Sequence, residues 1–266
     1  SMKSLYSLIL GLLLVHGDCA AQVFATIDAL SGSATITLAD GSSAAAATGQ
    51  KISRGQTVVT AANSELHAVT EDGGYIALRP NTTFLVSQFR MERDGTAAVE
   101  MSLLKGALRS ITGWIGKVNP GGYRVVTPTA TVGIRGTDHE TTVVEADGGR
   151  DRAGTFDHVL EGATILRSAA GEQHLEAGQH GFVPRDGNLA PRLLEAAPEF
   201  FSNRQLRIEE RIRERKEFVA RRVQQLGEER PGRAAAIADR IENASDDRRE
   251  AVKKQIQRRL QQRKVN

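Results

Sequence analysis

Runs of alternating apolar and polar residues fill most of the chain between residues 30 and 190. A period of two puts successive side chains on opposite faces of an extended chain, so each run predicts a β-strand with one buried face. Many runs are rich in Val, Thr and Ile, and Asp-Gly pairs typical of tight hairpin turns separate several of them. The predicted strands are 34–38, 56–60, 65–69, 75–78, 83–89, 97–104, 107–112, 123–127, 129–134, 139–144, 156–161, 163–168 and 180–183.

The pattern changes near Pro198, where alternation gives way to the three- and four-residue spacing of helices. One narrow apolar stripe consists of Ile212, Val219, Val223 and Leu226, and the sequence suggests helix breaks at 227–232 and 243–245. Narrow stripes favour a small helical bundle or a coiled-coil seam over a deep core. The chain is therefore predicted to be mainly β, with a hairpin-rich all-β domain followed by an α-helical C-terminal segment.

The N-terminus has the pattern of a secretory signal peptide. Ser1 precedes the expected initiator Met2, Lys3 supplies a positive charge, and residues 5–15 are apolar up to the small-residue site that ends at Ala21. About eleven apolar residues are few for a bilayer, so an uncleaved anchor is the less favoured alternative. We expect a signal peptide (1–21), a β domain (22–190) and a basic helical region (191–266), located in the periplasm or secreted from a bacterial envelope.

Charge is distributed unevenly between these regions. From residue 199 to the end, 19 basic and 12 acidic residues give a net charge of +7, whereas the rest of the chain carries −4. Much of the helical charge has the spacing of a solvated, salt-bridged face. The alternative is attachment to an anionic membrane or glycan surface through the basic helices. We expect no nucleic-acid partner, because the chain is expected to be exported.

Several motifs occur in a characteristic order between residues 32 and 183. They include "LLKGALRSITGWIGK" (103–117), "YRVVTPTATVGIRGTD" (123–138) and "AGQHGFV" (177–183). In this order they resemble the FecR domain family. The resemblance implies a solenoid-like all-β domain that works outside the cytoplasm in binding or signal relay, without catalytic apparatus.

The segment from 124 to 140 is the densest motif, and we interpret it as structural. Pro128 cannot donate a ladder hydrogen bond, so a strand start, bulge or edge is expected there, and two glycines mark bends or close backbone approach. Arg135 lies three residues before Asp138, and an internal pair between them is favoured over a ligand-binding arginine. The residues assigned to this structural motif are Thr127, Pro128, Thr129, Gly133, Arg135, Gly136 and Asp138.

The polar end of the motif resembles a reactive site but is not expected to be one. In a regular strand Asp138 and Glu140 point one way and His139 the other, so the three do not converge on a metal or substrate. Family members usually carry an aromatic or apolar residue at the position of His139, which implies a packing position. The chain also lacks nucleophile-elbow, phosphate-loop and zinc-helix motifs, so we predict no enzyme, no cofactor and no metal site.

The glycine-rich stretch 110–124 holds a second group of interest. Trp114, the only tryptophan, is accompanied by Lys117 and Arg124, and these three residues are candidates for recognition. A buried core tryptophan is the favoured alternative for Trp114.

Two function classes remain open. The first, which the sequence favours, is a secreted, non-catalytic binding or scaffolding module that recognises an envelope protein or glycan, with helices that dock or self-associate. The second is a signalling regulator that relays receptor occupancy to a sigma-factor system through a membrane partner, as the family resemblance implies.

Overall fold

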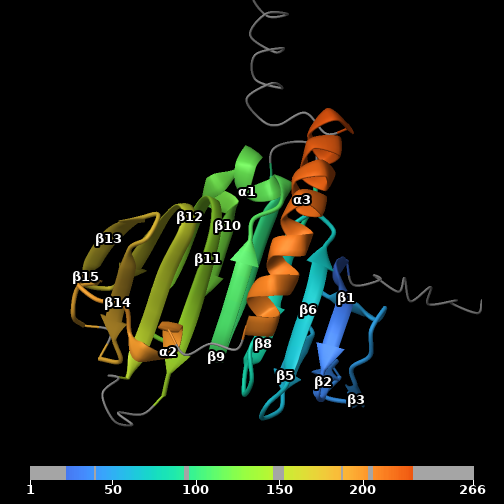
Figure 1. The fold of residues 1–266 in the computed structure, drawn as a ribbon, viewed down its shortest axis with the longest axis horizontal. Coiled ribbons are helices and arrows are strands. Elements are labelled where there is room, and N and C mark those ends of the chain that lie inside the picture. Colours follow the sequence, from blue (N-terminus) through green and yellow to red (C-terminus); the bar gives the residue numbers. More distant parts are fainter. Residues whose placement is uncertain are drawn as a thin grey trace, which may run out of the picture.

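The computed structural model describes residues 22–38, 40–92, 96–145, 153–186, 188–202 and 206–229. The predicted signal peptide (1–21) and the helices predicted beyond residue 229 lie outside these ranges. The described chain is mainly β, as predicted, with one long helix near its end (Figure 1).

Fifteen strands make up the sheet in the described part of the chain. In order they are β1 (Val23–Ser31), β2 (Ala34–Thr37), β3 (Ser43–Ala45), β4 (Lys51–Ser53), β5 (Thr57–Thr60), β6 (Glu65–Thr70), β7 (Tyr75–Leu78), β8 (Thr83–Arg90), β9 (Ala98–Ile111), β10 (Tyr123–Val126), β11 (Thr131–Val144), β12 (Gly154–Ser168), β13 (Gly171–Glu176), β14 (His180–Pro184) and β15 (Arg192–Leu194). The helices are α1 (Trp114–Val118), the 3-10 turn η1 (Pro120–Gly122), α2 (Glu199–Ser202) and α3 (Leu206–Glu229).

Neighbouring strands pair almost entirely in the antiparallel sense. The main path of the sheet runs β15-β14-β12-β11-β10-β9-β7-β6-β1-β4, with β2, β3, β5, β8 and β13 attached beside it. Among the described strands, β9 with β10 is the one parallel pair. Solenoid-like coiling is not shown by this pairing and stays a prediction.

Three long strands bend at glycines that the sequence pattern suggested as strand ends. Gly106 in β9, Gly136 in β11 and Gly162 in β12 all have positive φ, at 84°, 58° and 78°. Up to residue 105, β9 pairs with β8 and β10, and from Gly106 onward it pairs with β11 and β7. Glycine adopts this backbone geometry without steric cost, so each strand continues through the bend. The predicted strand pairs 97–104/107–112, 129–134/139–144 and 156–161/163–168 are therefore three single strands.

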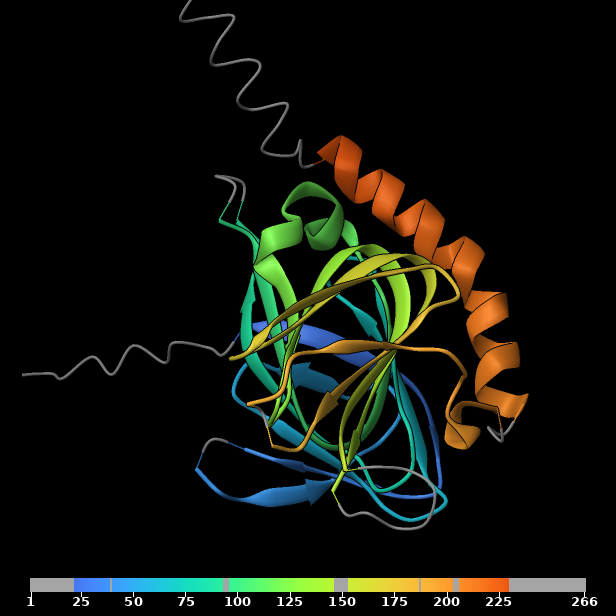
Figure 2. The same ribbon diagram turned by 90° about the vertical axis from the view of Figure 1, so that its left-hand side faces the viewer.

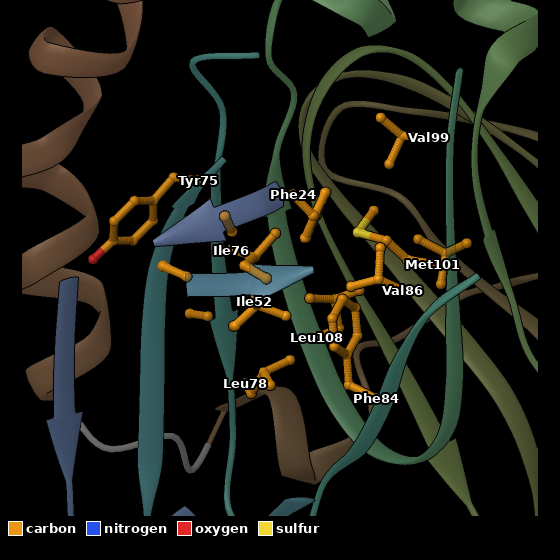
Figure 3. Close-up of a cluster of buried hydrophobic side chains, with 14 of the residues drawn as sticks. Phe24, Ile52, Tyr75, Ile76, Leu78, Phe84, Val86, Val99, Met101 and Leu108 are labelled. Carbon is orange, nitrogen blue, oxygen red and sulfur yellow. The ribbon is translucent and has the colours of Figure 1, made fainter. Parts of the chain in front are cut away.

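The sheet curls round on itself (Figure 2), and buried apolar side chains form the core inside it. Phe24, Ile52, Phe84 and Leu108 are fully buried and come from four different strands (Figure 3). Phe24 also meets Phe89 edge to face, with ring centroids 5.4 Å apart. Burial of each such side chain contributes about 1.5–3 kcal/mol to folding, so this cluster holds the strands together.

Helix α3 lies on the outside of the curled sheet and crosses several strands (Figures 1 and 2). The short helix α2, which precedes α3 in the chain, packs on β12, where Phe200 meets Phe156 edge to face with ring centroids 5.1 Å apart. None of the described helices combines the length and apolar character needed to cross a bilayer.

Candidate functional site

Helix α3 is held on the β domain first by its apolar stripe. Ile212, Val219, Val223 and Leu226 are exposed by only 1–5%, although they belong to an otherwise highly charged helix. Their spacing of three, four and seven residues places them on one helical face. Close approach is helped by Gly73 in the β6–β7 turn, where a Cβ would lie 3.2 Å from the Leu226 Cδ1. The predicted stripe is confirmed and packs on the β domain; a coiled coil is not shown.

A first ion-pair contact ties the middle of α3 to β1. Arg215 Nη2 donates to Asp28 Oδ1 at 2.6 Å, and Arg211 Nη1 lies 3.8 Å from Asp28 Oδ2. The Tyr75 hydroxyl, which points toward α3 in Figure 3, also donates to Asp28 at 3.4 Å. The helix is thereby connected through Tyr75 to the core.

A second contact joins α3 to the motif strand β11. Lys216 Nζ lies 2.9 Å from Asp138 Oδ2 and 2.5 Å from Glu161 Oε1. Asp138 is only 2% exposed and also receives a two-pronged contact from Arg109, at 2.9 Å to Oδ1 and 3.0 Å to Oδ2. Burial alone would raise the pKa of Asp138, but the hydrogen bonds and charges of Arg109 and Lys216 outweigh it and lower that pKa. Asp138 is therefore held as a carboxylate between a strand arginine and a helix lysine.

The next acid on β11 forms a similar buried pair. Both Glu140 oxygens accept hydrogen bonds from Arg79, each at 2.7 Å, and neither residue is more than 7% exposed. Forked arginine–carboxylate pairs fix orientation as well as charge. Two such pairs side by side make this half of β11 a rigid charged layer beneath the domain surface.

His139 points the opposite way, as the alternation predicts. It is fully buried, and its Nδ1 lies 2.9 Å from Asp157 Oδ1. The hydroxyls of Thr141 and Thr164 also donate to Asp157, at 2.8 and 2.7 Å. The imidazole therefore does fill a packing position, but it is polar-partnered, unlike the apolar residue that the family resemblance implies. Within the described ranges, no group of three or more His, Cys, Asp or Glu side chains could hold a metal ion.

The predicted pair between Arg135 and Asp138 is wrong. Asp138 is paired with Arg109 and Lys216, while Arg135 is exposed on the far side of the bulge at Gly136. The bulge adds a residue and re-aims the side chains that follow it. Arg109 could have been suspected, because it stands alone among apolar and small residues in a predicted strand.

Three of the remaining motif residues, Thr127, Pro128 and Thr129, lie in the turn between β10 and β11, and the two glycines lie within β11. Thr127 and Thr129 both reach the Thr155 hydroxyl on β12, each at 2.7 Å. Pro128 sits between them at the turn, where no ladder donor is needed. Gly133 and Gly136 differ: a Cβ on Gly133 would lie 3.2 Å from Arg167 Nη1, whereas one on Gly136 would meet no atom within 4 Å.

The three predicted recognition residues do not come together. Trp114 is a core residue, 3% exposed, while Lys117 lines a pocket of about 410 Å³ beside Lys216 and Val219 of α3. Arg124 lies elsewhere, paired with Glu100 across β10 and β9 at 2.6 Å. Their role in recognition stays a prediction.

A second pocket, of about 360 Å³, flanks the other side of α3. Its lining includes Glu65 and His67 of β6 and Arg211 and Glu214 of the helix. Burial and the nearby charge of Arg211 lower the pKa of His67 to about 4, so the imidazole is neutral near pH 7. Pockets therefore border α3 on both sides, between the helix and the β domain.

Among models of known protein families, the one described as FecR protein matches residues 56–163. Residues 56–163 form a FecR domain. This FecR domain runs from β5 into β12, so it contains Arg109, Asp138 and Glu140, whereas α3 lies beyond it. The predicted resemblance is confirmed.

Two solved structures of a candidate anti-sigma factor from Parabacteroides distasonis are partly similar, at 14% and 13% identity, with TM-scores of 0.42 and 0.43. Each alignment covers 55% of this chain and 62% of the other, so the chain spans less than two thirds of their length. A cell surface anchoring domain aligns over 82% of its own length and 23% of this chain, at 22% identity and a TM-score of 0.23. No curated protein sequence matches this chain.

Proposed function

We propose that the chain is a non-catalytic signalling regulator of the bacterial envelope, exported to the periplasm or secreted. The FecR domain supports a role in signalling more strongly than the scaffolding role that the sequence first favoured. In this proposal the chain relays the state of a receptor to a sigma-factor system through a membrane partner.

The observation that carries the proposal is the contact between Lys216 and Asp138. It links the helix outside the FecR domain to a buried carboxylate of its motif strand. This link supports our proposal that the position of α3 is coupled to the state of that strand. Asp138 keeps Arg109 as a partner when Lys216 leaves, and the helix can therefore separate without stranding a buried charge.

Release of α3 would uncover a surface suited to a partner helix. The exposed face would carry the carboxylates of Asp28, Asp138 and Glu161 beside the partly apolar pocket lining at Ile111. Such a face fits a basic amphipathic helix that packs its apolar stripe against it. We propose that a segment of the membrane partner competes with α3 for this face.

The test is Lys216→Glu in the native host, with transcript profiling. The new carboxylate faces Asp138 and Glu161, so repulsion should detach α3, which hydrogen exchange of the purified protein would register as faster exchange in 206–229. Arg213→Glu is the matched control, because Arg213 is exposed on the same helix.

The signalling role predicts that deletion of the gene and Lys216→Glu alter overlapping sets of transcripts, while Arg213→Glu resembles wild type. An unchanged transcript profile in the deletion strain would refute signalling. The scaffolding role would then be tested by recovery of envelope partners after cross-linking.

A further inference from the structure

A separate pocket of about 240 Å³ lies on the face of the sheet formed by β10, β11 and β12, at η1. Its lining includes Arg124, Arg135 and Arg167, together with Gly133 and Ile165. None of these residues belongs to the contacts beneath α3.

Strand register explains why three arginines surround one pocket. Arg124 of β10 pairs with Gly133 of β11, which pairs in turn with Ile165 of β12. Directly opposed residues share a face of the sheet, and so do residues two apart along a strand. Arg135 lies two residues from Gly133, and Arg167 two residues from Ile165, so all three guanidinium groups project from this face.

Gly133 leaves the space between the arginines open. A Cβ at this position would stand 3.2 Å from Arg167 Nη1, tighter than an ordinary contact. The glycine therefore gives Arg167 room over the strand and keeps the centre of the pocket free of side-chain atoms.

The charges of the pocket are only partly balanced. Arg124 is paired with Glu100, and Arg167 with Glu172 at 3.0 Å, while the described residues form no ion pair with Arg135. The two pairs are solvent-exposed, and such pairs contribute little and exchange readily. Each guanidinium has five N–H donors, so donors on all three arginines remain for a ligand.

We propose that this pocket binds a monosaccharide-sized organic anion, a sugar that carries a carboxylate or a phosphate. Arginine forks match the planar or branched oxygens of these groups, and Arg135 makes the primary contact because it has no competing carboxylate. Ile165 and the exposed Pro120 give the lining apolar surface for the sugar body. The site is independent of the signalling role proposed above.

Isothermal titration at low ionic strength tests the site with galacturonate and glucose 6-phosphate, using galactose and glucose as neutral counterparts. We expect saturable 1:1 binding of at least one anion and none of its neutral counterpart. The anion that binds identifies the group: carboxylate, phosphate, or either.

Arg135→Gln and Arg124→Gln should each weaken that binding at least tenfold without a change in thermal stability. Arg54→Gln is the control, because Arg54 is an exposed arginine in the β4–β5 turn, remote from the pocket in the pairing order of the strands. Absence of saturable anion binding would overturn the proposal. Equal binding by wild type and both pocket variants, or equal loss in Arg54→Gln, would also overturn it.

Discussion

The two halves of β11 use charge in opposite ways. From Thr131 to Arg135 the strand alternates regularly, with Val132 and Ile134 in the core and the other face turned to the arginine pocket. From Asp138 to Thr142 both faces are buried, and three consecutive ionisable residues lie within the protein. The comparison shows that a run of charged residues can be buried where neighbouring segments provide side chains of opposite charge, as Arg109 and Arg79 do here.

The charged side chains of the two halves also have different partners. In the buried half each acid has an arginine from an adjacent strand or loop, because an unpaired charge there would cost several kcal/mol. In the exposed half water solvates Arg135, and no partner is required. A charged side chain in the buried half is structural, whereas a charged side chain in the exposed half is free to meet a ligand.

The largest expected difference between the halves is in the free energy of unfolding of two variants, Arg109→Ala and Arg135→Ala. Loss of Arg109 leaves Asp138 buried with Lys216 alone, so we expect unfolding to become easier by about 3–5 kcal/mol. Arg135→Ala should change the free energy of unfolding by less than about 0.5 kcal/mol. Urea denaturation measures both. Similar losses in the two variants would show that the halves do not differ as described.

Acidification should destabilise the buried half by a smaller amount. His158, opposite Glu140 on β12, has its pKa lowered to about 4 by burial and by His180, whose ring stacks on it at 4.1 Å. The unfolded chain has a histidine pKa of about 6.5, so it binds more protons than the folded chain between these values. Stability is therefore retained above pH 6.5 and falls as the pH drops toward 4.

The slope of stability against pH in that window measures this effect. His67 has a similar lowered pKa and adds to the slope, so His158→Phe should reduce the slope without abolishing it. The lowered pKa of Asp138 acts only in more acidic solution, where its protonation removes further stability. An unchanged slope in His158→Phe would assign the effect to other groups.

The smallest expected effect concerns the bulge that separates the halves. Gly136→Ala should cost about 1 kcal/mol, because alanine is strained at a φ of 58°, although no neighbouring atom obstructs its Cβ. Gly136→Asn should cost less, since asparagine tolerates the left-handed region. Thermal melts decide between strain and packing: equal losses for both variants would indicate a steric cause.

The strand content and the apolar stripe of α3 were predictable from the sequence because both depend on local periodicity. A bend at Gly136 was one of the two outcomes expected there, but the bends at Gly106 and Gly162 were not predicted, since glycine suggests both a strand end and a bend within a strand. Strand pairing decides between them, and pairing joins residues far apart in the chain.

The site was less predictable than the fold for the same reason. The sequence paired Arg135 with Asp138 on proximity alone, and the bulge reverses that expectation. It also weighed a solvated, salt-bridged helical face against attachment to an anionic surface, whereas Arg215 and Lys216 are bound to carboxylates of the β domain. The partners of these two charges come from β1, β11 and β12, which no local pattern connects.

The contact between Asp28 and Arg215 has a consequence for how the chain folds. The two residues are 187 positions apart, so the contact closes the longest loop among the hydrogen bonds described. Closure of a long loop has an entropic cost that must be met before the contact forms, and elements joined in this way assemble slowly. We therefore expect α3 to dock after the sheet has formed, which would leave the surface that it covers open to a competing segment until then.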